Sequence, residues 1–231
     1  MKLSAPIYRL KRQARLISRE AKIPLHEALD RVAKQEGFAS WSSLAEKFAA
    51  EAPGEKLYSQ MRPGSLTLLA ARPGQGKTLL ALELAVEAMK AGNRAVVFSL
   101  EFTETECRNS LGEALLHHEN LFTFDGSDSM SAETIMLRLA DSARGTFVVV
   151  DYLQLLDQRR ETPDLMIQIQ ALKSLAIQKG LTMVFISQVS RDYDPAKKQF
   201  PDLQDVRLPN PLDLTLFDIT CFLHDGEIQF R

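Results

Sequence analysis

The sequence predicts an α/β fold with a mainly parallel, doubly wound sheet, preceded by a small all-helical module. Two observations predict it. Short apolar runs alternate with helical patterns after residue 57, and this alternation is typical of parallel strands joined by helical crossovers. The first fifty residues instead have helical spacing and a basic first segment. We therefore expect a helical module over residues 1–49, a linker over 50–56 and the α/β domain over 57–231.

The first helix is predicted to be amphipathic. Its apolar residues recur at helical spacing and are Ile7, Leu10, Ala14, Ile17 and Ala21. Its opposite face is basic and consists of Arg12, Arg15, Arg19 and Lys22. A basic face of this kind favours a solvated helix surface over a docking site for nucleic acid or a protein partner. An organelle presequence is a further alternative, because acidic residues are scarce before Glu20.

Two more helices complete the predicted module. Pro24 suits the first turn of the second helix and Gly37 suits its end. Ser43 and Glu46 have the spacing of a capping box for a short third helix. The expected core residues of the module are Leu25, Leu29, Val32, Phe38, Trp41 and Leu44.

The α/β domain is predicted from four apolar runs and the helical patterns between them. The predicted strands cover residues 65–71, 94–100, 145–151 and 181–187. The predicted helices cover about 77–91, 103–118, 131–143 and 164–179. Near the end, "ITCFLHDGEIQF" predicts two strands around a tight Asp225-Gly226 turn. In such sheets ligands bind beyond the carboxyl ends of the strands.

Composition excludes several classes of protein. The formal net charge of −2 does not suit a protein that coats nucleic acid by bulk charge. No apolar run approaches a membrane span, and no apolar signal-peptide core is present. The two cysteines, Cys107 and Cys221, lack metal-ligand spacing and are expected to be idle thiols in a reducing compartment. We expect a cytoplasmic protein without membrane contact.

The segment "AARPGQGKT" follows the first predicted strand and predicts a phosphate-binding loop. Gly74 and Gly76 allow backbone N–H groups to approach phosphate oxygens closely. Lys77 supplies a charge for the β- and γ-phosphates, and the Thr78 hydroxyl suits Mg²⁺. The predicted nucleotide-binding residues are Arg72, Pro73, Gly74, Gln75, Gly76, Lys77, Thr78 and Leu79. ATP and Mg²⁺ are the expected ligands.

Three further polar residues follow the other predicted strands. Asp151 ends a buried strand, where it could hold Mg²⁺ or be an ordinary strand-end residue. Glu101 could orient or deprotonate an attacking water, or serve only as an acidic residue at a helix start. Gln188 could sense the γ-phosphate or be a simple turn residue.

The motifs together resemble the ATPase domain of DnaB-type replicative helicases, a branch of the RecA-like P-loop ATPases. The segments that carry the resemblance are "AARPGQGKT", "VVFSLE", "LFTFDGSDSMSAETI", "VVVDYLQLL", "FISQVSRDYD" and "PDLQDVR…DITCFLHD". They span about residues 57–227 in that order. In that family an alanine at the first glycine position of the loop is usual.

The resemblance implies roles for the polar residues. Lys77 and Thr78 would be the phosphate and Mg²⁺ residues, and Asp151 the aspartate on the metal side. Glu101 would be the catalytic glutamate and Gln188 the γ-phosphate sensor. Lys77, Glu101 and Gln188 are thus the expected catalytic residues, and Thr78 and Asp151 the expected metal residues.

The resemblance also implies where single-stranded DNA would bind. In that family, the loops after the strands that here end near Asp151 and Gln188 line the pore of a ring. Here these loops carry Arg159, Arg160, Arg191, Lys197, Lys198 and Arg207. Acidic residues stand among them, so ordinary solvated loop charge is the competing interpretation. A ring would concentrate such local charges around its axis.

The chain also departs from the family pattern. Its N-terminal module differs from the larger N-terminal domain of those helicases, and it stops at Arg231, before the basic finger that completes a neighbouring subunit's site. Pro209 and Pro211 replace the usual glycine-containing stretch. We expect a Mg²⁺-dependent ATPase acting on single-stranded DNA. The alternatives are a slow or non-hydrolysing ATP switch that docks a partner through its N-terminal helices, and, less favoured, a P-loop kinase.

Overall fold

The computed structural model contains two compact units, Met1–Pro53 and Gly54–Arg231. It describes residues 4, 7–44, 53–127, 130–157, 163–208 and 210–231. The short helix α4 (Pro53–Tyr58) begins inside the segment predicted as a linker. Pro53 suits a first helical turn because proline has the required φ, and Glu55 favours the positive end of the helix dipole.

The N-terminal unit consists of helices, as its periodicity predicts. They are α1 (Ile7–Ala21), α2 (Leu25–Gln35) and a third helix of which residues 41–44 are described. The third helix begins earlier than predicted. Ser40, not Ser43, caps it, because the Ser40 hydroxyl accepts from the Ser43 backbone N–H at 3.2 Å and the Ser43 hydroxyl accepts from the Ser40 N–H at 3.3 Å.

The core of this unit is built largely from small residues. Its buried apolar side chains are Leu10, Ala14, Ala28, Val32, Ala33 and Leu44. The expected core residue Leu25, which is the first residue of α2, is instead 42% exposed. On α1, Arg15 and Arg19 are exposed, as is Lys22 just after the helix. The side chain of Arg12, also predicted to lie on the basic face, is outside the described part of the structure.

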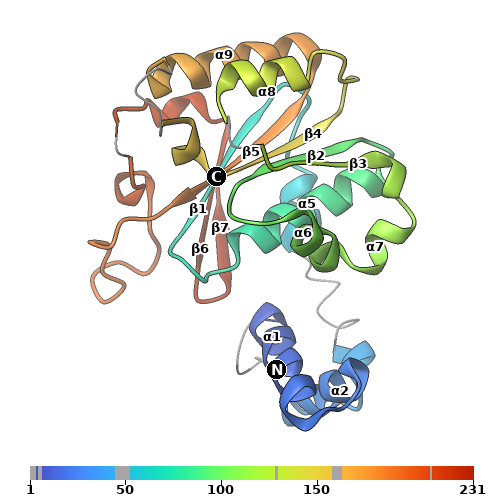
Figure 1. Cartoon of the computed structure of the whole chain (residues 1–231). Helices are drawn as coiled ribbons and strands as arrows, with labels where there is room; N and C mark the ends of the chain where they lie inside the picture. The colour runs from blue at the N-terminus through green and yellow to red at the C-terminus, as the bar shows by residue number, and fades with distance from the viewer. Residues whose placement is uncertain (1–3, 5–6, 45–52, 128–129, 158–162, 209) are drawn as a thin grey trace. The chain divides into compact units, whose positions relative to one another are not determined.

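The second unit is built on a seven-stranded sheet of order β3-β2-β4-β5-β1-β6-β7 (Figure 1). The strands are β1 (Leu66–Ala71), β2 (Ala95–Ser99), β3 (Phe122–Asp125), β4 (Phe147–Asp151), β5 (Thr182–Gln188), β6 (Ile219–His224) and β7 (Glu227–Phe230). The first six run parallel, and β7 pairs antiparallel with β6. The predicted mainly parallel sheet and the final hairpin are confirmed.

Helices cover both faces of the sheet (Figure 1). The α-helices of this unit after α4 are α5 (Lys77–Lys90), α6 (Glu104–Leu111), α7 (Glu113–Leu116), α8 (Ala132–Arg138) and α9 (Leu165–Lys179). Its 3₁₀ turns are η1 (Glu119–Leu121), η2 (Leu153–Asp157), η3 (Leu203–Asp205) and η4 (Leu214–Leu216).

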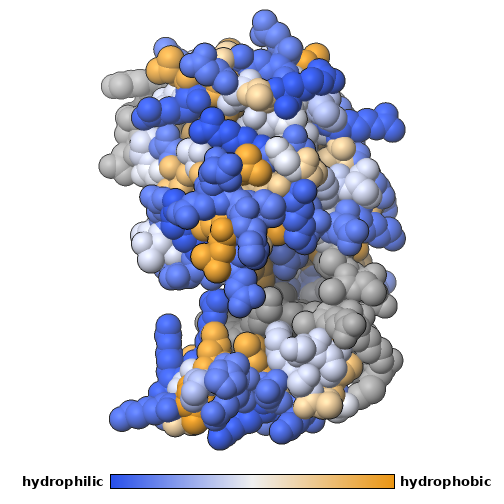
Figure 2. Space-filling model, turned by 90° about the vertical axis from the view of Figure 1, so that its right-hand side faces the viewer, coloured by the Kyte–Doolittle hydropathy of each residue, from blue (hydrophilic) through white to orange (hydrophobic). Residues whose placement is uncertain are grey.

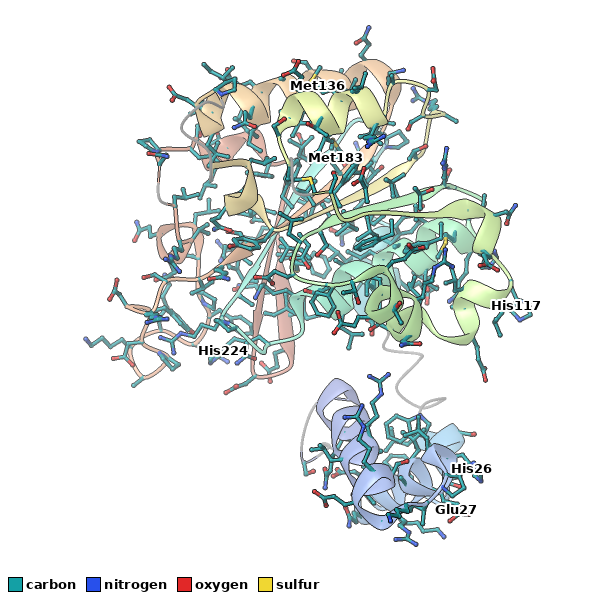
Figure 3. All side chains as sticks on the ribbon, viewed as in Figure 1. His26, Glu27, His117, Met136, Met183 and His224 are labelled. Atoms are coloured by element: carbon teal, nitrogen blue, oxygen red, sulfur yellow. The ribbon has the colours of Figure 1, made fainter. Side chains whose placement is uncertain are left out.

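The two faces of the sheet form separate hydrophobic cores. One core packs α8 and α9 on the sheet, and the other packs α5, α6 and α7 on the opposite face. Met183 of β5 lies in the first core and Met136 of α8 packs against it (Figure 3). Because both faces are covered, the central strands are near-continuous apolar runs.

Two predictions of local structure were wrong in detail, and one strand was not predicted. The helix expected over 103–118 is broken at Gly112, whose φ of 56° lies outside the helical range, into α6 and α7. The helix expected over 131–143 ends at Arg138. The short edge strand β3 was not predicted, because it has only four residues and one of them, Thr123, is polar in the middle of the strand.

Among the described residues, no helix has the length and apolar character that crossing a bilayer requires. On the face shown in Figure 2, hydrophilic residues predominate and hydrophobic ones are scattered in small groups. Both cysteines are buried, and burial raises the pKa of Cys107 to about 11 and that of Cys221 to about 12.

Candidate functional site

The carboxyl ends of β2, β4, β5 and β1 lie next to one another at one edge of the sheet. The strand register pairs Ser99 with Asp151, and Ala71 with Gln188. Because these strands are parallel, the residue that follows each strand emerges at the same edge. This arrangement brings the segments after all four predicted strands together.

The predicted phosphate loop connects β1 to α5. Gly74 and Gly76 have φ values of 77° and 91°, a left-handed conformation that side chains with a Cβ rarely adopt. Helix α5 then begins at Lys77, and no side chain caps its first turn. The first N–H groups of a helix have no partner inside the helix and attract anions. The loop therefore presents backbone donors and a helix dipole to an anion.

Asp151 is the most unusual side chain at this edge. It is 1% exposed. One of its carboxylate oxygens accepts a hydrogen bond from the Thr78 hydroxyl at 3.1 Å, whereas the other has no hydrogen-bond partner. Among the described residues it is the only buried carboxylate with such an oxygen. Burial, and then the charge of Glu101, raises the pKa of Asp151 to about 6, while Thr78 and Lys77 act in the opposite direction.

Lys77 completes a charged cluster with the two acidic residues. Its ammonium group donates to the carbonyl of Arg72 at 3.3 Å. Burial lowers the pKa of Lys77, and the charges of Asp151 and Glu101 raise it. The lysine and both carboxylates, predicted from three different segments, thus interact electrostatically in the fold.

The segment after β2 holds Glu101 at this edge. The Ser99 hydroxyl accepts from the backbone N–H groups of Glu101 and Phe102, both at 3.2 Å. Two residues later, Thr103 and Glu106 form a capping box that starts α6. These bonds fix the backbone on both sides of Glu101, whose side chain is exposed. An exposed carboxylate beside a buried one is available to a water or a ligand.

Gln188 ends β5 beside the phosphate loop. Its carbonyl accepts from the Arg207 N–H at 2.7 Å. The sequence did not single out Gln154, which lies under the same region. Gln154 donates to the Ser187 hydroxyl at 2.9 Å and to the carbonyl of Arg207 at 2.6 Å. The sequence signal that could have identified Gln154 is a polar residue inside the apolar run of "DYLQLL".

The residues predicted to contact DNA divide into three groups. Arg191, Lys197 and Arg207 are exposed after β5. Lys198 is instead held by Asp202 and Asp205, at 2.5 and 2.7 Å. Arg159 and Arg160 lie outside the described residues. The structure thus brings several basic side chains to one loop, where acidic neighbours pair with Lys198 and, at 3.7 Å, with Lys197.

Metal binding at this edge would need ligands beyond the protein. In the part of the chain that the structure describes, no group of three or more His, Cys, Asp or Glu side chains could hold a metal ion. Asp151 and the Thr78 hydroxyl nevertheless offer two oxygens side by side. This donor set suits Mg²⁺, which usually takes one or two carboxylates together with phosphate oxygens and water.

The family of the chain follows from a comparison with known protein families. The model of the "DnaB-like helicase C terminal domain" matches residues 55–121 and 105–227, which together cover most of the chain. The chain belongs to this family. The resemblance drawn from the sequence motifs is therefore confirmed, and the DnaB-like assignment accounts for the RecA-like sheet and for the strand–loop–helix order of the phosphate loop.

Curated relatives of this DnaB-like chain are replicative helicases. The "Replicative DNA helicase DnaB" of Leifsonia xyli subsp. xyli is 26% identical over 204 residues, which are 74% of this chain and 44% of the relative. The protein of the same name from Geobacillus stearothermophilus is 24% identical over 208 residues, covering 74% of this chain and 45% of the relative. The chain spans less than half the length of these relatives.

Two solved structures share the fold. One of them, titled as an "ATPase Domain", is 22% identical, with a TM-score of 0.59 and 74% of each chain covered. The structure titled "The Structure Of A DnaB-Like Replicative Helicase And Its Interactions With Primase" is 18% identical, with a TM-score of 0.59 and coverage of 93% of this chain and 66% of that one. At these identities the likeness establishes the RecA-like fold alone.

Proposed function

We propose that this DnaB-like chain is a Mg²⁺-dependent ATPase that single-stranded DNA stimulates. The observation that carries the proposal is the buried Asp151, with one oxygen bonded to Thr78 and the other without a partner, beside Lys77 and Glu101. A carboxylate left partly unsatisfied in a protein interior destabilises the fold. Such a group is typical of functional sites.

ATP would bind with its phosphates against the phosphate loop. The backbone around Gly74 and Gly76 and the first turn of α5 would surround the phosphates, and the Lys77 ammonium would approach their β- and γ-oxygens. Lys77 is well suited because the ammonium group donates its hydrogen bond to a carbonyl, that of Arg72, rather than to a carboxylate. Its positive charge is then available to a polyanion.

The metal ion would be held by Thr78, by Asp151 and by the phosphates. When bound, Mg²⁺ would neutralise charge on the phosphate oxygens. The Asp151 oxygen that lacks a partner belongs to the carboxylate that accepts from the Thr78 hydroxyl, and it fits this role. Proteins commonly place such a residue on the metal side of the nucleotide.

Glu101 and Gln188 would act at the γ-phosphate. An exposed carboxylate next to the loop can accept a proton from water or orient it, as a general base does. Gln188, at the end of β5 and in register with the last residue of β1, could donate to the γ-phosphate. Loss of the γ-phosphate would then be communicated to the chain that follows Gln188.

Single-stranded DNA would bind the loop after β5. Arg191, Lys197 and Arg207 are exposed there, and a local basic groove can follow a phosphate backbone even in a protein with net negative charge. Arg159 and Arg160 stay predictions for the loop after β4. A homo-oligomeric ring, which the resemblance to DnaB-type helicases implies, would bring copies of these residues around one axis.

The test is ATP hydrolysis with Mg²⁺, in the presence and absence of a dT oligonucleotide. We expect Lys77→Ala to lose ATP binding and Glu101→Gln to bind ATP but hydrolyse it about 10²–10⁴-fold more slowly. Lys90→Ala, at the exposed end of the same helix, and Glu113→Gln, at the exposed start of α7, are matched controls. Unchanged turnover in Lys77→Ala would contradict the site, and ATP binding without any turnover in the wild type would support a switch instead.

A further inference from the structure

The Arg72 side chain lies at the start of the phosphate loop but bonds to a distant segment. Its guanidinium donates to the backbone carbonyl of Arg191 at 2.7 Å and also to the carbonyl of Tyr193. The same group lies over the Tyr193 ring, 5.5 Å from the ring centre. One phosphate-loop side chain thus makes three contacts with residues about 120 positions later in the sequence.

Tyr193 is the anchor of the segment that Arg72 contacts. The ring is 3% exposed, and its hydroxyl donates to the carbonyls of Lys198 and Gln199, at 2.8 and 3.1 Å. A buried tyrosine with both its ring and its hydroxyl engaged holds the surrounding backbone in one conformation. A displacement of Arg72 would therefore be transmitted to the residues around Tyr193.

These residues belong to a closed loop, the 189–207 loop, which begins directly after Gln188. Val189 pairs with Val206 across its base, and the Ser190 N–H donates to the carbonyl of Asp205 at 2.7 Å. The loop carries Lys197, which is exposed and pairs with Asp194 at 3.7 Å, and Lys198, which pairs with Asp205 at 2.7 Å. Because its base is closed, the loop can move as a unit.

A second bond joins the phosphate loop to the β6–β7 hairpin. The Gln75 side-chain oxygen accepts from the Asp225 backbone N–H at 3.0 Å. The preceding residue, His224, which Figure 3 labels at the end of β6, lies edge-on to Tyr193 with ring centres 5.6 Å apart. The phosphate loop, the hairpin and the 189–207 loop therefore meet around the Tyr193 ring.

We propose that Arg72 is a positioning residue, which ties the phosphate loop to the 189–207 loop so that bound nucleotide sets the position of that loop and its affinity for single-stranded DNA. This inference rests on the proposed function. Arginine suits the role because its planar guanidinium can hold two carbonyls and an aromatic face at once, whereas lysine offers a flexible point charge. Coupling between two sites is reciprocal, so DNA on the loop would also alter nucleotide affinity.

The experiment compares the wild type with Arg72→Lys, with Tyr193→Phe and with the control Arg94→Lys. Arg94 is a suitable control because its guanidinium also bonds a neutral oxygen, that of Thr123 at 3.1 Å, away from the site. Hydrogen–deuterium exchange of peptides covering 189–207 is measured without nucleotide and at a concentration of Mg²⁺ and ATPγS that saturates each variant. Affinity for a fluorescent dT oligonucleotide is measured by anisotropy under the same two conditions.

In the wild type and Arg94→Lys, we expect ATPγS to change loop exchange and DNA affinity by about tenfold, within the usual range of coupling. In Arg72→Lys both responses should fall below about twofold, and Tyr193→Phe should be intermediate because it keeps the ring but loses the hydroxyl bonds. A purely structural role for Arg72 would change exchange equally with and without nucleotide. That result, or a wild-type response in Arg72→Lys, would overturn the inference.

Failure of the proposed function has a different signature. If the wild type does not bind ATPγS, both the function and the inference are wrong. If it binds ATPγS but not DNA, hydrogen–deuterium exchange of the 189–207 loop still decides the role of Arg72. Only the claims about DNA, in the proposed function and in the inference, are then wrong. If it binds both ligands without any response of the loop, the proposed function stands and the inference is overturned.

Discussion

Asp151 at the end of β4 and Gln168 in the first turn of α9 are both almost completely buried, with exposed fractions of 1% and 2%. Every polar group of Gln168 is engaged. Its oxygen accepts from the Ala132 N–H at 3.0 Å, and its amide donates to the carbonyls of Leu156 and Pro163, at 2.6 and 2.8 Å. Asp151 has one bond, to Thr78, and one oxygen without a partner.

The difference in hydrogen bonding distinguishes a buried polar residue that stabilises the fold from one that serves a function. A buried polar side chain that is fully hydrogen-bonded joins elements together and stabilises them, as Gln168 joins α8, η2 and α9. A buried carboxylate that lacks a partner opposes folding and persists where it has another use. Replacing each residue should therefore have opposite consequences for stability and for activity.

The largest expected effect is the loss of turnover in Asp151→Asn. The substitution keeps the shape of the side chain but removes the charge proposed to hold Mg²⁺, so ATP hydrolysis should fall about 10²–10³-fold, as when another preorganised electrostatic group is lost. The matched control is Asp125→Asn at the end of β3, whose carboxylate pairs with Arg138 at 3.1 Å. Equal losses in both variants would mean that Asp151 has no special role.

The second effect is on stability and concerns Gln168→Leu. Leucine fills the space but leaves the Ala132 N–H and two carbonyls without partners, which should lower the free energy of unfolding by about 2–4 kcal/mol. Urea denaturation measures the change, and Gln170→Leu on the exposed face of α9 should stay within about 0.5 kcal/mol of the wild type. Turnover per folded molecule should not change. A marked loss of turnover without a loss of stability would contradict a purely structural role for Gln168.

A smaller effect is expected from pH. Burial raises the pKa of Asp151 from 3.8 to about 6, so protonation should compete with Mg²⁺·ATP below pH 6 and the affinity should fall by up to about tenfold per pH unit. Folding stability should depend on pH in the opposite direction from the affinity for Mg²⁺·ATP. The folded state holds the proton more tightly than the unfolded state between about pH 4 and 6, so the contribution of Asp151 to stability decreases as pH rises through this window and is constant above it.

Binding measurements between about pH 5 and 8 check this expectation. The wild type should lose affinity for Mg²⁺·ATPγS on the acid side, and Asp151→Asn should bind weakly with a much flatter profile. An identical slope in both proteins would assign the titration to another group.

Much of the fold could be predicted from local patterns. The buried strands β1, β2, β4 and β5 are apolar runs, and apolar runs bounded by turn residues are a strong signal. Strand β3 escaped because an edge strand of four residues has little periodicity to detect. Ser40 was missed as a cap because "SWSS" offers several serines, and only the folded backbone decides which one accepts the bond.

The candidate site also has a part that could be predicted from the sequence and a part that could not. Lys77, Thr78 and Asp151 could be placed at one edge because their positions after strands are a matter of chain order. The contacts of Arg72 with the 189–207 loop could not be predicted, since they depend on how a loop of irregular structure packs about 120 residues away. The partner-free oxygen of Asp151 likewise follows from packing in three dimensions, and sequence indicates only that a carboxylate ends the strand.

The most direct test of the contrast between the two residues is the free energy of unfolding of Asp151→Asn, with and without Mg²⁺·ATP. A pKa raised by about two units corresponds to a few kcal/mol, so the variant alone should be more stable than the wild type by about 1–3 kcal/mol at about pH 7.5. Mg²⁺·ATP should stabilise the wild type and leave the variant nearly unchanged. A variant that is less stable than the wild type, or that Mg²⁺·ATP stabilises equally, would contradict a functional role for the buried carboxylate.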